Sequence, residues 1–248
     1  MRRVSVPFSN SDAMQESFQD HFAQFDFGFT LTASKTALMI IDMQYASASR
    51  DMGMGRRLNL RGQDELGRYR FDRIEKTCVP TIQRLLQFFR AHGLRIIYLT
   101  IGSNLSDYMD MPQTLREVAR ANNNRKGERE HEILDALKPQ SGEIILNKTT
   151  TGGFASTSLD STLRTFGLHT LAFCGVSTDQ CVESTARVAA DLGYNCIIVE
   201  DGCGASSSEL HDATMKSFRR ILGRVSSSVT LMNEISAQVL LQSGPRKD

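Results

Sequence analysis

The sequence lacks long apolar runs and has almost no net charge. None of its hydrophobic stretches is long enough to span a bilayer. The 29 Lys and Arg residues against 28 Asp and Glu give a net charge of +1, which offers no electrostatic reason to expect a nucleic-acid partner. No apolar stretch follows the two N-terminal arginines, so we do not expect a secretory signal. These absences favour a cytoplasmic protein that binds neither membranes nor nucleic acid.

The sequence has few cysteines, and their number and spacing do not suit a disulfide framework or a zinc site. The five cysteines are Cys78, Cys174, Cys181, Cys196 and Cys203. An odd number argues against a disulfide framework. No pair has the C-x-x-C spacing, and no histidine lies between the second and the last of them, so zinc ligation is poorly supported. The remaining interpretations are core packing and nucleophilic chemistry.

The pattern that is present is an alternation of buried strands and amphipathic helices. Continuous apolar runs that suit central strands of a parallel sheet lie at 36–43, 94–102, 142–148, 168–176 and 194–201, with a short strand near 224–228. Helical patterns, most of them closed by glycine, lie at 78–93, 156–167, 179–193, 208–223 and 230–242. The alternation predicts an α/β fold, a three-layer α/β/α sandwich around a mostly parallel sheet of about six strands.

The domain organisation follows from the same pattern. Residues 1–33 are polar with interspersed phenylalanines, and we expect an N-terminal arm that docks on the body or on a neighbouring subunit. Residues 34–243 are expected to form a single domain. Within it, residues 45–70 are rich in Gly and Arg and are predicted to form a long loop, which in a compact domain is usually functional or disordered.

Three reactive side chains follow strands of this predicted sheet. Asp42 ends the first strand, Lys148 ends the third, and Cys181 lies at the start of the helix after the fourth. Ligands of open α/β sheets bind beyond the carboxyl ends of the strands, so we expect the three to converge. A helix N-terminus and Lys148 would favour the thiolate, and Asp42 is placed to accept the thiol proton. The amides of the turn before Cys181 are candidates for holding an oxyanion.

The stretches "IIDMQ", "LNKTTTGGFASTSLDSTLR" and "GVSTDQCVESTARVAADLGY" resemble the isochorismatase-like cysteine hydrolases, over roughly residues 36–228. That superfamily includes nicotinamidase, N-carbamoylsarcosine amidase, biuret and triuret hydrolases and ureidoacrylate amidohydrolase. The resemblance implies the fold predicted above. It also implies that Cys181 is the nucleophile, Asp42 the general base and Lys148 the third member of the triad.

The resemblance further implies a cis peptide between Val176 and Ser177, and an oxyanion hole made by the amides of Ser177 and Cys181. Substrate contacts are predicted for Gln44, Tyr45, Asn104, Phe154 and Val176. Homodimers or homotetramers are common in the superfamily, so we expect one of these assemblies here.

Departures from the family pattern disfavour some of the activities that are known in the superfamily. The sequence has no Asp-x-His signature after the first strand, so no metal and no other cofactor is expected, and nicotinamidase is disfavoured. Thr151 stands where biuret hydrolases carry a second lysine. The stretches "TSLDSTLR" and "CVESTAR" resemble the ureidoacrylate amidohydrolase branch most, and the substrate of that branch carries a carboxylate. The loop arginines Arg50, Arg56, Arg57 and Arg61 are candidates for pairing with such a group.

The sequence therefore predicts a metal-independent cysteine amidohydrolase that cleaves a C–N bond of a small amide or ureido compound through a thioester, releasing ammonia or carbamate. Two alternatives remain open. One is an isochorismatase-type vinyl ether hydrolase that uses Asp42, although the presence of Cys181 argues against it. The other is a non-catalytic binding protein of the same fold. The exact substrate is not defined by the sequence.

Overall fold

The structure is a computed structural model that describes residues 28–242. Within this range the strands form one six-stranded, all-parallel sheet in the order β3-β2-β1-β4-β5-β6. The strand bounds are β1 Thr36–Ile41, β2 Arg95–Ile101, β3 Ile144–Lys148, β4 Thr170–Val176, β5 Asn195–Gly204 and β6 Arg224–Ser226. The strand order reverses direction between β1 and β4, and such a switch point is where ligands of open α/β sheets bind.

The central strands form where the sequence predicts them because their runs are apolar on both faces. Every residue of β1 and of β4 is buried. A parallel strand covered by helices on both sides has no solvent-facing positions, so its sequence is continuous rather than alternating.

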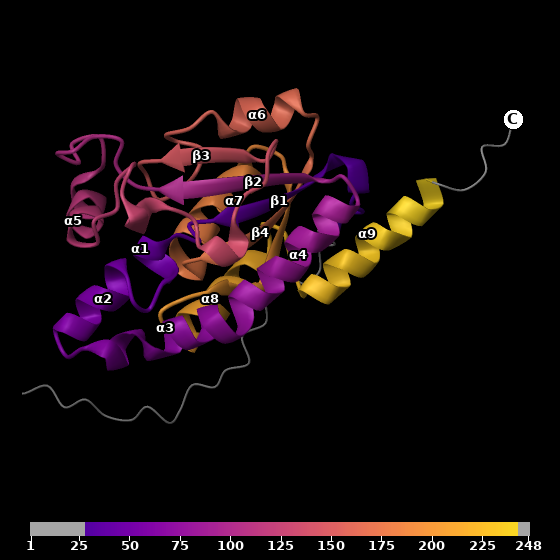
Figure 1. The fold of residues 1–248 in the computed structure, drawn as a ribbon. Coiled ribbons are helices and arrows are strands. Elements are labelled where there is room, and N and C mark those ends of the chain that lie inside the picture. Colours follow the sequence, from indigo (N-terminus) through magenta and orange to yellow (C-terminus); the bar gives the residue numbers. More distant parts are fainter. Residues whose placement is uncertain (1–27, 243–248) are drawn as a thin grey trace, which may run out of the picture.

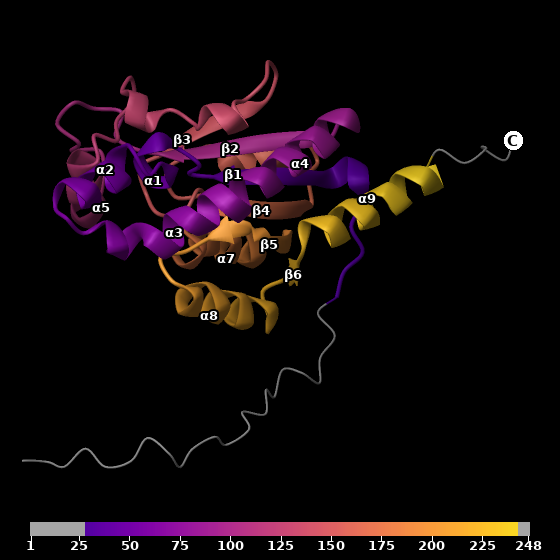
Figure 2. The same ribbon diagram turned by 60° about the horizontal axis from the view of Figure 1, so that its bottom comes forward.

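Helices cover both faces of this sheet (Figures 1 and 2). Their bounds are α4 Val79–Ala91, α6 Leu159–Thr165, α7 Glu183–Asp191, α8 Ser208–Arg219 and α9 Ser228–Gln242. Helices α4 and α9 pack on each other and lie on one face, whereas α6, α7 and α8 lie on the other. The predicted three-layer α/β/α fold is therefore confirmed.

The prediction of a long loop at 45–70 is wrong, because most of this stretch is helical. It contains α1 (Tyr45–Ala48), α2 (Gly53–Leu60) and the start of α3 (Arg68–Arg73). Its glycines suggested a loop, but two of them serve close packing. A Cβ on Gly53 would lie 2.4 Å from the Cα of Ala46, and one on Gly55 would lie 2.1 Å from the carbonyl oxygen of Arg50.

A further helix, α5 (Gln113–Ala121), lies in the connection from β2 to β3, where the sequence pattern predicts no helix. Tyr108, Met111 and Ala119 form a small apolar cluster beneath it, separate from the main core. Figure 1 shows α5 beside α1 and α2, at the end of the molecule toward which the arrowheads of β2 and β3 point. These helices form the wall around the carboxyl end of the sheet.

Of the predicted arm at 1–33, residues 1–27 lie outside the described range. In the described part, Leu31 and Ala33 are buried, and Nη1 of Arg224 donates a hydrogen bond to the carbonyl oxygen of Phe29. Residues 28–33 thus pack on the body of the protein. Among the helices of residues 28–242, none combines the length and the apolar character needed to cross a membrane.

Candidate active site

Asp42 is the first residue after β1 and lies at the switch point of the sheet. Its backbone has φ of +51°, a left-handed conformation that few residues other than glycine adopt. Two hydrogen bonds hold it there: its amide donates to the carbonyl oxygen of Leu99, and the Ser47 hydroxyl donates to the Asp42 carbonyl at 2.6 Å. The end of β1 is therefore bent so that the Asp42 side chain is fixed beside the neighbouring strand ends.

Lys148, the last residue of β3, forms a fully buried ion pair with Asp42. Its Nζ donates to Asp42 Oδ2 at 2.8 Å and also to the carbonyl oxygen of Thr150. Both side chains are almost completely inaccessible to solvent. The other carboxylate oxygen, Oδ1, is buried and has no hydrogen-bond partner within residues 28–242. Asp42 thus has one oxygen neutralised by a cation and one that is free to accept a proton.

Burial and charge act against each other on this pair. Burial raises the pKa of Asp42, while Lys148, the Cys181 thiol and Arg70 lower it, and the net pKa is above the ordinary value. Burial lowers the pKa of Lys148, but the Asp42 carboxylate and Cys181 raise it by more than burial lowers it. The net pKa is above the ordinary value, so the ammonium is retained.

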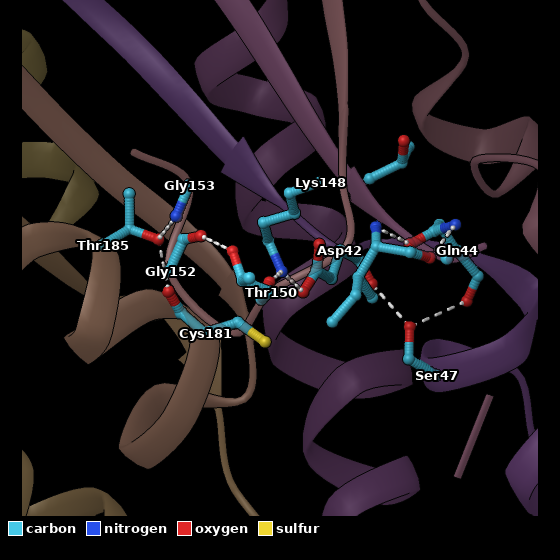
Figure 3. A network of polar contacts seen from close by, with 12 residues as sticks. Asp42, Gln44, Ser47, Lys148, Thr150, Gly152, Gly153, Cys181 and Thr185 are labelled. Atoms are coloured by element: carbon cyan, nitrogen blue, oxygen red, sulfur yellow. Dashed lines mark hydrogen bonds and ion pairs between the residues drawn. The ribbon is translucent and has the colours of Figure 1, made fainter. Parts of the chain in front are cut away.

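Cys181 lies in a π-helical turn, Thr178–Val182, that joins β4 to α7. Figure 3 shows its sulfur directed toward Asp42 and Lys148. Burial, reinforced by the Asp42 charge, raises the pKa of the thiol to about 12, whereas Lys148 lowers it. Burial and the Asp42 charge therefore act against the thiolate, whereas the Lys148 charge favours it. The proton must leave when the sulfur reacts.

Two polar contacts fix the turn that carries Cys181. The Thr185 hydroxyl donates to the Cys181 carbonyl at 2.6 Å and accepts from the Gly153 amide (Figure 3). His211 of α8 contacts Thr178 through Nδ1 and Arg73 through Nε2. Since an arginine only donates, Nε2 accepts and the Nδ1–H donates to the Thr178 hydroxyl. Burial and the Arg73 charge lower the pKa of His211 to about 4, which keeps the ring neutral.

A cavity of about 100 Å³ opens directly on Asp42 and Cys181. The peptide bond between Val176 and Ser177 is cis, and both residues line this cavity. The polar lining also includes Ser47, Arg70, Asn122, Asn124 and Gln180, and the apolar lining includes Met54, Ile101, Met111, Leu115, Val118 and Ala119. The dimensions suit a small molecule with both polar and apolar parts.

Sequence reasoning missed most of these lining residues. Arg70 belongs to the Arg-rich stretch 45–70, whose sequence predicts an exposed, basic segment. Only the packing of α3 in the structure shows that Arg70 is buried. Asn122 and Asn124 follow α5, which was not predicted. No sequence signal separates them from the other polar residues of that connection. The left-handed backbone of Asp42 and its partly buried hydrogen bond from Ser47 likewise have no local sequence signature.

The structure does not bring four of the predicted substrate contacts to the cavity. Gln44 is fully buried, and its amide exchanges hydrogen bonds with the backbone of Ile101. Tyr45 directs its hydroxyl to Arg129 and Asp135 at the surface. The remaining two contact other side chains: Asn104 binds Asp110 and Asn147, and the ring of Phe154 lies near that of Tyr194.

The four candidate arginines are also absent from the cavity lining. Arg50 pairs with Asp72 and Glu75, and Arg56 pairs with Glu130. Arg57 donates to Asn122 and Arg61 is exposed. Their charges are satisfied by the protein or by solvent, so the expectation that they bind a substrate carboxylate is not supported by their positions.

The described part of the chain contains no cluster of three or more His, Cys, Asp or Glu residues arranged to bind a metal ion. The remaining cysteines Cys78, Cys174, Cys196 and Cys203 are free thiols buried in the protein. Burial raises the pKa of each of them above its ordinary value.

The fold and the site together define an α/β protein with a doubly wound parallel sheet that carries an Asp, a Lys and a Cys at its switch point. The Isochorismatase domain family model matches residues 36–229. The chain belongs to the isochorismatase family, as the sequence motifs predicted.

Sequence similarity to individual proteins supports the same family assignment. The chain is 31% identical to the ureidoacrylate amidohydrolase RutB of Acinetobacter baylyi, over 82% of this chain and 84% of that protein. It is 32% identical to the Rhizobium rhizogenes protein of the same name, over 69% and 71% of the two chains.

Among solved structures, a cysteine hydrolase from Pseudomonas syringae superposes with a TM-score of 0.70 at 22% identity, over 85% of this chain and 97% of that one. An N-carbamoylsarcosine amidase from Thermoplasma acidophilum gives 0.58 at 25% identity, over 78% and 96%. The first likeness concerns the fold alone.

Proposed function

We propose that this protein is a metal-independent cysteine amidohydrolase that cleaves a non-peptide C–N bond of a small amide or ureido compound through a thioester. Family membership and the similarity to amidohydrolases support the enzyme class. The observation that carries the mechanism is the buried Asp42, which has one oxygen on Lys148 and the other unpartnered beside the Cys181 thiol.

The first half-reaction forms the thioester. Asp42 takes the proton from Cys181 as the sulfur bonds to the substrate carbonyl carbon, and the carbonyl electrons move to oxygen. The amides of Ser177 and Cys181 are the proposed donors to this oxyanion. When the oxyanion collapses, the C–N bond breaks and Asp42 returns the proton to the leaving nitrogen.

The second half-reaction releases the acid. Asp42, again ionised, takes a proton from a water molecule that attacks the thioester carbon, and the C–S bond breaks with the proton returning to sulfur. A ureido substrate yields a carbamate, which decomposes to carbon dioxide and an amine or ammonia. Lys148 stays charged throughout, and its charge favours the ionised form of Asp42 against the effect of burial whenever Asp42 has to accept a proton. Side chains supply the nucleophile, the base and the cation, so no metal or other cofactor is part of the proposal.

The test is ammonia release from a panel of small amides and ureido compounds by wild type, Cys181→Ala and Cys196→Ala. We expect Cys181→Ala to lose nearly all activity. Cys196→Ala, which alters a buried cysteine at the opposite end of the sheet, should remain active. Activity retained by Cys181→Ser would instead indicate ether-type hydrolysis through Asp42. Failure of every compound with wild type would favour a binding protein.

We also propose a homodimer or homotetramer. Large apolar side chains are exposed on and after α2, where Leu60 is 79% and Leu66 is 69% accessible. Their exposure makes them candidates for an interface between subunits, because contiguous apolar surface often marks such an interface.

A further inference from the structure

Arg70 is a buried arginine that lies between the general base and the nucleophile turn, residues 177–182. It belongs to α3, it is 3% exposed, and it lines the catalytic cavity together with Asp42 and Cys181. It is not a member of the proposed triad. Arginine is rarely buried without specific partners, so the partners of Arg70 indicate what it does.

The guanidinium of Arg70 bridges two segments that are far apart in the sequence. Its Nε and Nη2 donate to the carbonyl oxygen of Ser47 at 3.1 and 2.9 Å, and its Nη1 donates to the Ser177 hydroxyl at 2.6 Å. The Ser47 carbonyl lies in the last turn of the short helix α1, where carbonyl groups lack a donor within the helix. A planar guanidinium reaches both acceptors at once with fixed geometry, whereas the single ammonium nitrogen of a lysine cannot reproduce this fork.

Each end of this bridge belongs to a different half of the catalytic machinery. The Ser47 hydroxyl donates to the Asp42 carbonyl at 2.6 Å and holds the left-handed backbone that carries the base (Figure 3). Ser177 begins the nucleophile turn, and its amide and that of Cys181 are the proposed oxyanion donors. Arg70 therefore connects the base, through Ser47, to the oxyanion donors, through Ser177.

The charge of Arg70 is stabilised by the acidic groups around it. Burial lowers its pKa, whereas four neighbouring groups raise it: Cys181, Asp179, Cys78 and Asp42. An arginine stays protonated in a folded protein, so a full positive charge lies beside the thiol and the base. The effect is mutual, because the charge of Arg70 lowers the pKa of Asp42 and favours the thiolate of Cys181.

We propose that Arg70 is a positioning residue that clamps the general base and the nucleophile turn in register and holds a positive charge beside both. The clamp acts through Ser47 and Ser177, so its effect reaches the substrate through Asp42 and the oxyanion donors. Catalytic groups have to be held within about 0.5 Å of the productive geometry, and a misplacement of about 1 Å can cost about 10²-fold in rate. This inference deepens the proposed amidohydrolase function and rests on it.

The experiment separates the clamp from the charge by measuring kcat, KM and the pH profile of kcat/KM on the best substrate of the panel. Arg70→Met removes both, so kcat should fall by about 10²-fold with little change in KM. Its acid limb should move to higher pH, because Asp42 loses a charge that lowers its pKa.

Two further variants keep the charge and weaken the clamp. Arg70→Lys loses the fork, and Ser177→Ala loses the hydroxyl that accepts from Arg70 but keeps the backbone amide. In both, kcat should fall by about tenfold, the effect of one hydrogen bond to a charged group, while the acid limb stays at the wild-type pH. The matched control is Arg68→Met, in the same helix, because Arg68 is exposed and pairs with Glu65. It should behave as wild type.

A wild-type kcat in Arg70→Met, whatever its KM, would overturn the inference, and so would a lowered kcat with an unmoved acid limb. Full activity of Ser177→Ala would also overturn it, and this variant tests the clamp even if Arg70→Met does not fold. In each of these cases Cys181-dependent ammonia release by wild type would leave the proposed function intact.

A wild type that turns over no compound would count against the proposed function, and alkylation then tests the clamp without a substrate. Cys181 is reacted with iodoacetamide at neutral pH, and the labelled peptide is quantified by mass spectrometry. We expect Arg70→Met to react several-fold more slowly than wild type and Arg68→Met to react at the wild-type rate, because only the former loses a charge that favours the thiolate. An equal or faster rate in Arg70→Met would overturn the inference.

Discussion

At Asp42, burial and the Lys148 ammonium pull the pKa in opposite directions. The base must be ionised to take the thiol proton, so its pKa sets the pH below which activity falls. Because burial raises that pKa, the acid limb of the pH profile should lie above the range of an ordinary aspartate. Activity is lost as the pH falls through the raised pKa and is retained above it.

Replacing Lys148 should move this limb. Lys148→Met removes the charge that lowers the pKa of Asp42, so the limb of the residual activity should shift to higher pH. The maximal rate should fall by about 10² to 10⁴, the usual contribution of a positioned acid–base group. The measurement is kcat/KM against pH, with Lys76→Met as the control, because Lys76 forms only an exposed pair with Asp72. A limb that stays in place or moves to lower pH would contradict the assigned role of Lys148.

The reactive residues were predictable from sequence because each lies at the end of a strand, or just after one, that is recognisable from its apolar run. The residues around them were not. Arg70 is as polar as its exposed neighbours, and its burial depends on how α3 packs against residues far away in the chain. Tyr45 and Asn104 are close in sequence to strand ends, yet each is held elsewhere by partners that no local pattern specifies.

At the scale of elements, Gly175 in β4 controls how closely the two central strands approach at the switch point. It has φ of +120°, and an added Cβ would lie 2.0 Å from the carbonyl oxygen of Ile41, the residue before Asp42. No side chain fits between the strands at this level. The glycine thus allows Asp42 and the turn carrying Cys181 to lie side by side.

We therefore expect Gly175→Ala to destabilise the protein and to displace Asp42. The matched control is Gly167→Ala, which also has positive φ, of +62°, but has open space around the added carbon. The control should cost about 1 kcal/mol of unfolding free energy, and Gly175→Ala about 2 kcal/mol more, since it adds a steric clash. Urea unfolding measures both. Equal losses in the two variants would show that the strand contact is not limiting.

The elements themselves were predictable to different degrees. The strands are recognisable from their continuous apolar runs. An amphipathic pattern of core-facing residues predicts the helices α4, α7, α8 and α9. The sequence predicts a loop at α2 because glycines such as Gly53 and Gly55 usually interrupt helices, whereas here they let the backbone pack against Ala46 and Arg50. Helix α5 rests on its own small cluster and not on the main core, so the alternation of strand and helix gave no reason to expect it.

At the scale of the whole molecule, the exposed leucines near α2 bear on assembly. If they form an interface, light scattering should give the mass of a dimer or tetramer of the 27.6 kDa chain. Leu60→Lys together with Leu66→Lys should shift that mass downward, because a charge cannot be buried there without a partner. Leu240, 72% exposed at the other end of the molecule, provides the control position. A monomeric mass for wild type would contradict the proposed assembly.

The catalytic proposal as a whole depends on a covalent bond between substrate and Cys181. The decisive measurement is intact-protein mass spectrometry on wild type quenched in acid during turnover of the best substrate, followed by peptide mapping. We predict an added acyl or carbamoyl group that maps to Cys181 and disappears after the substrate is consumed. It should be absent from Cys181→Ala. Steady turnover with no adduct, or an adduct on another cysteine, would contradict the thioester mechanism.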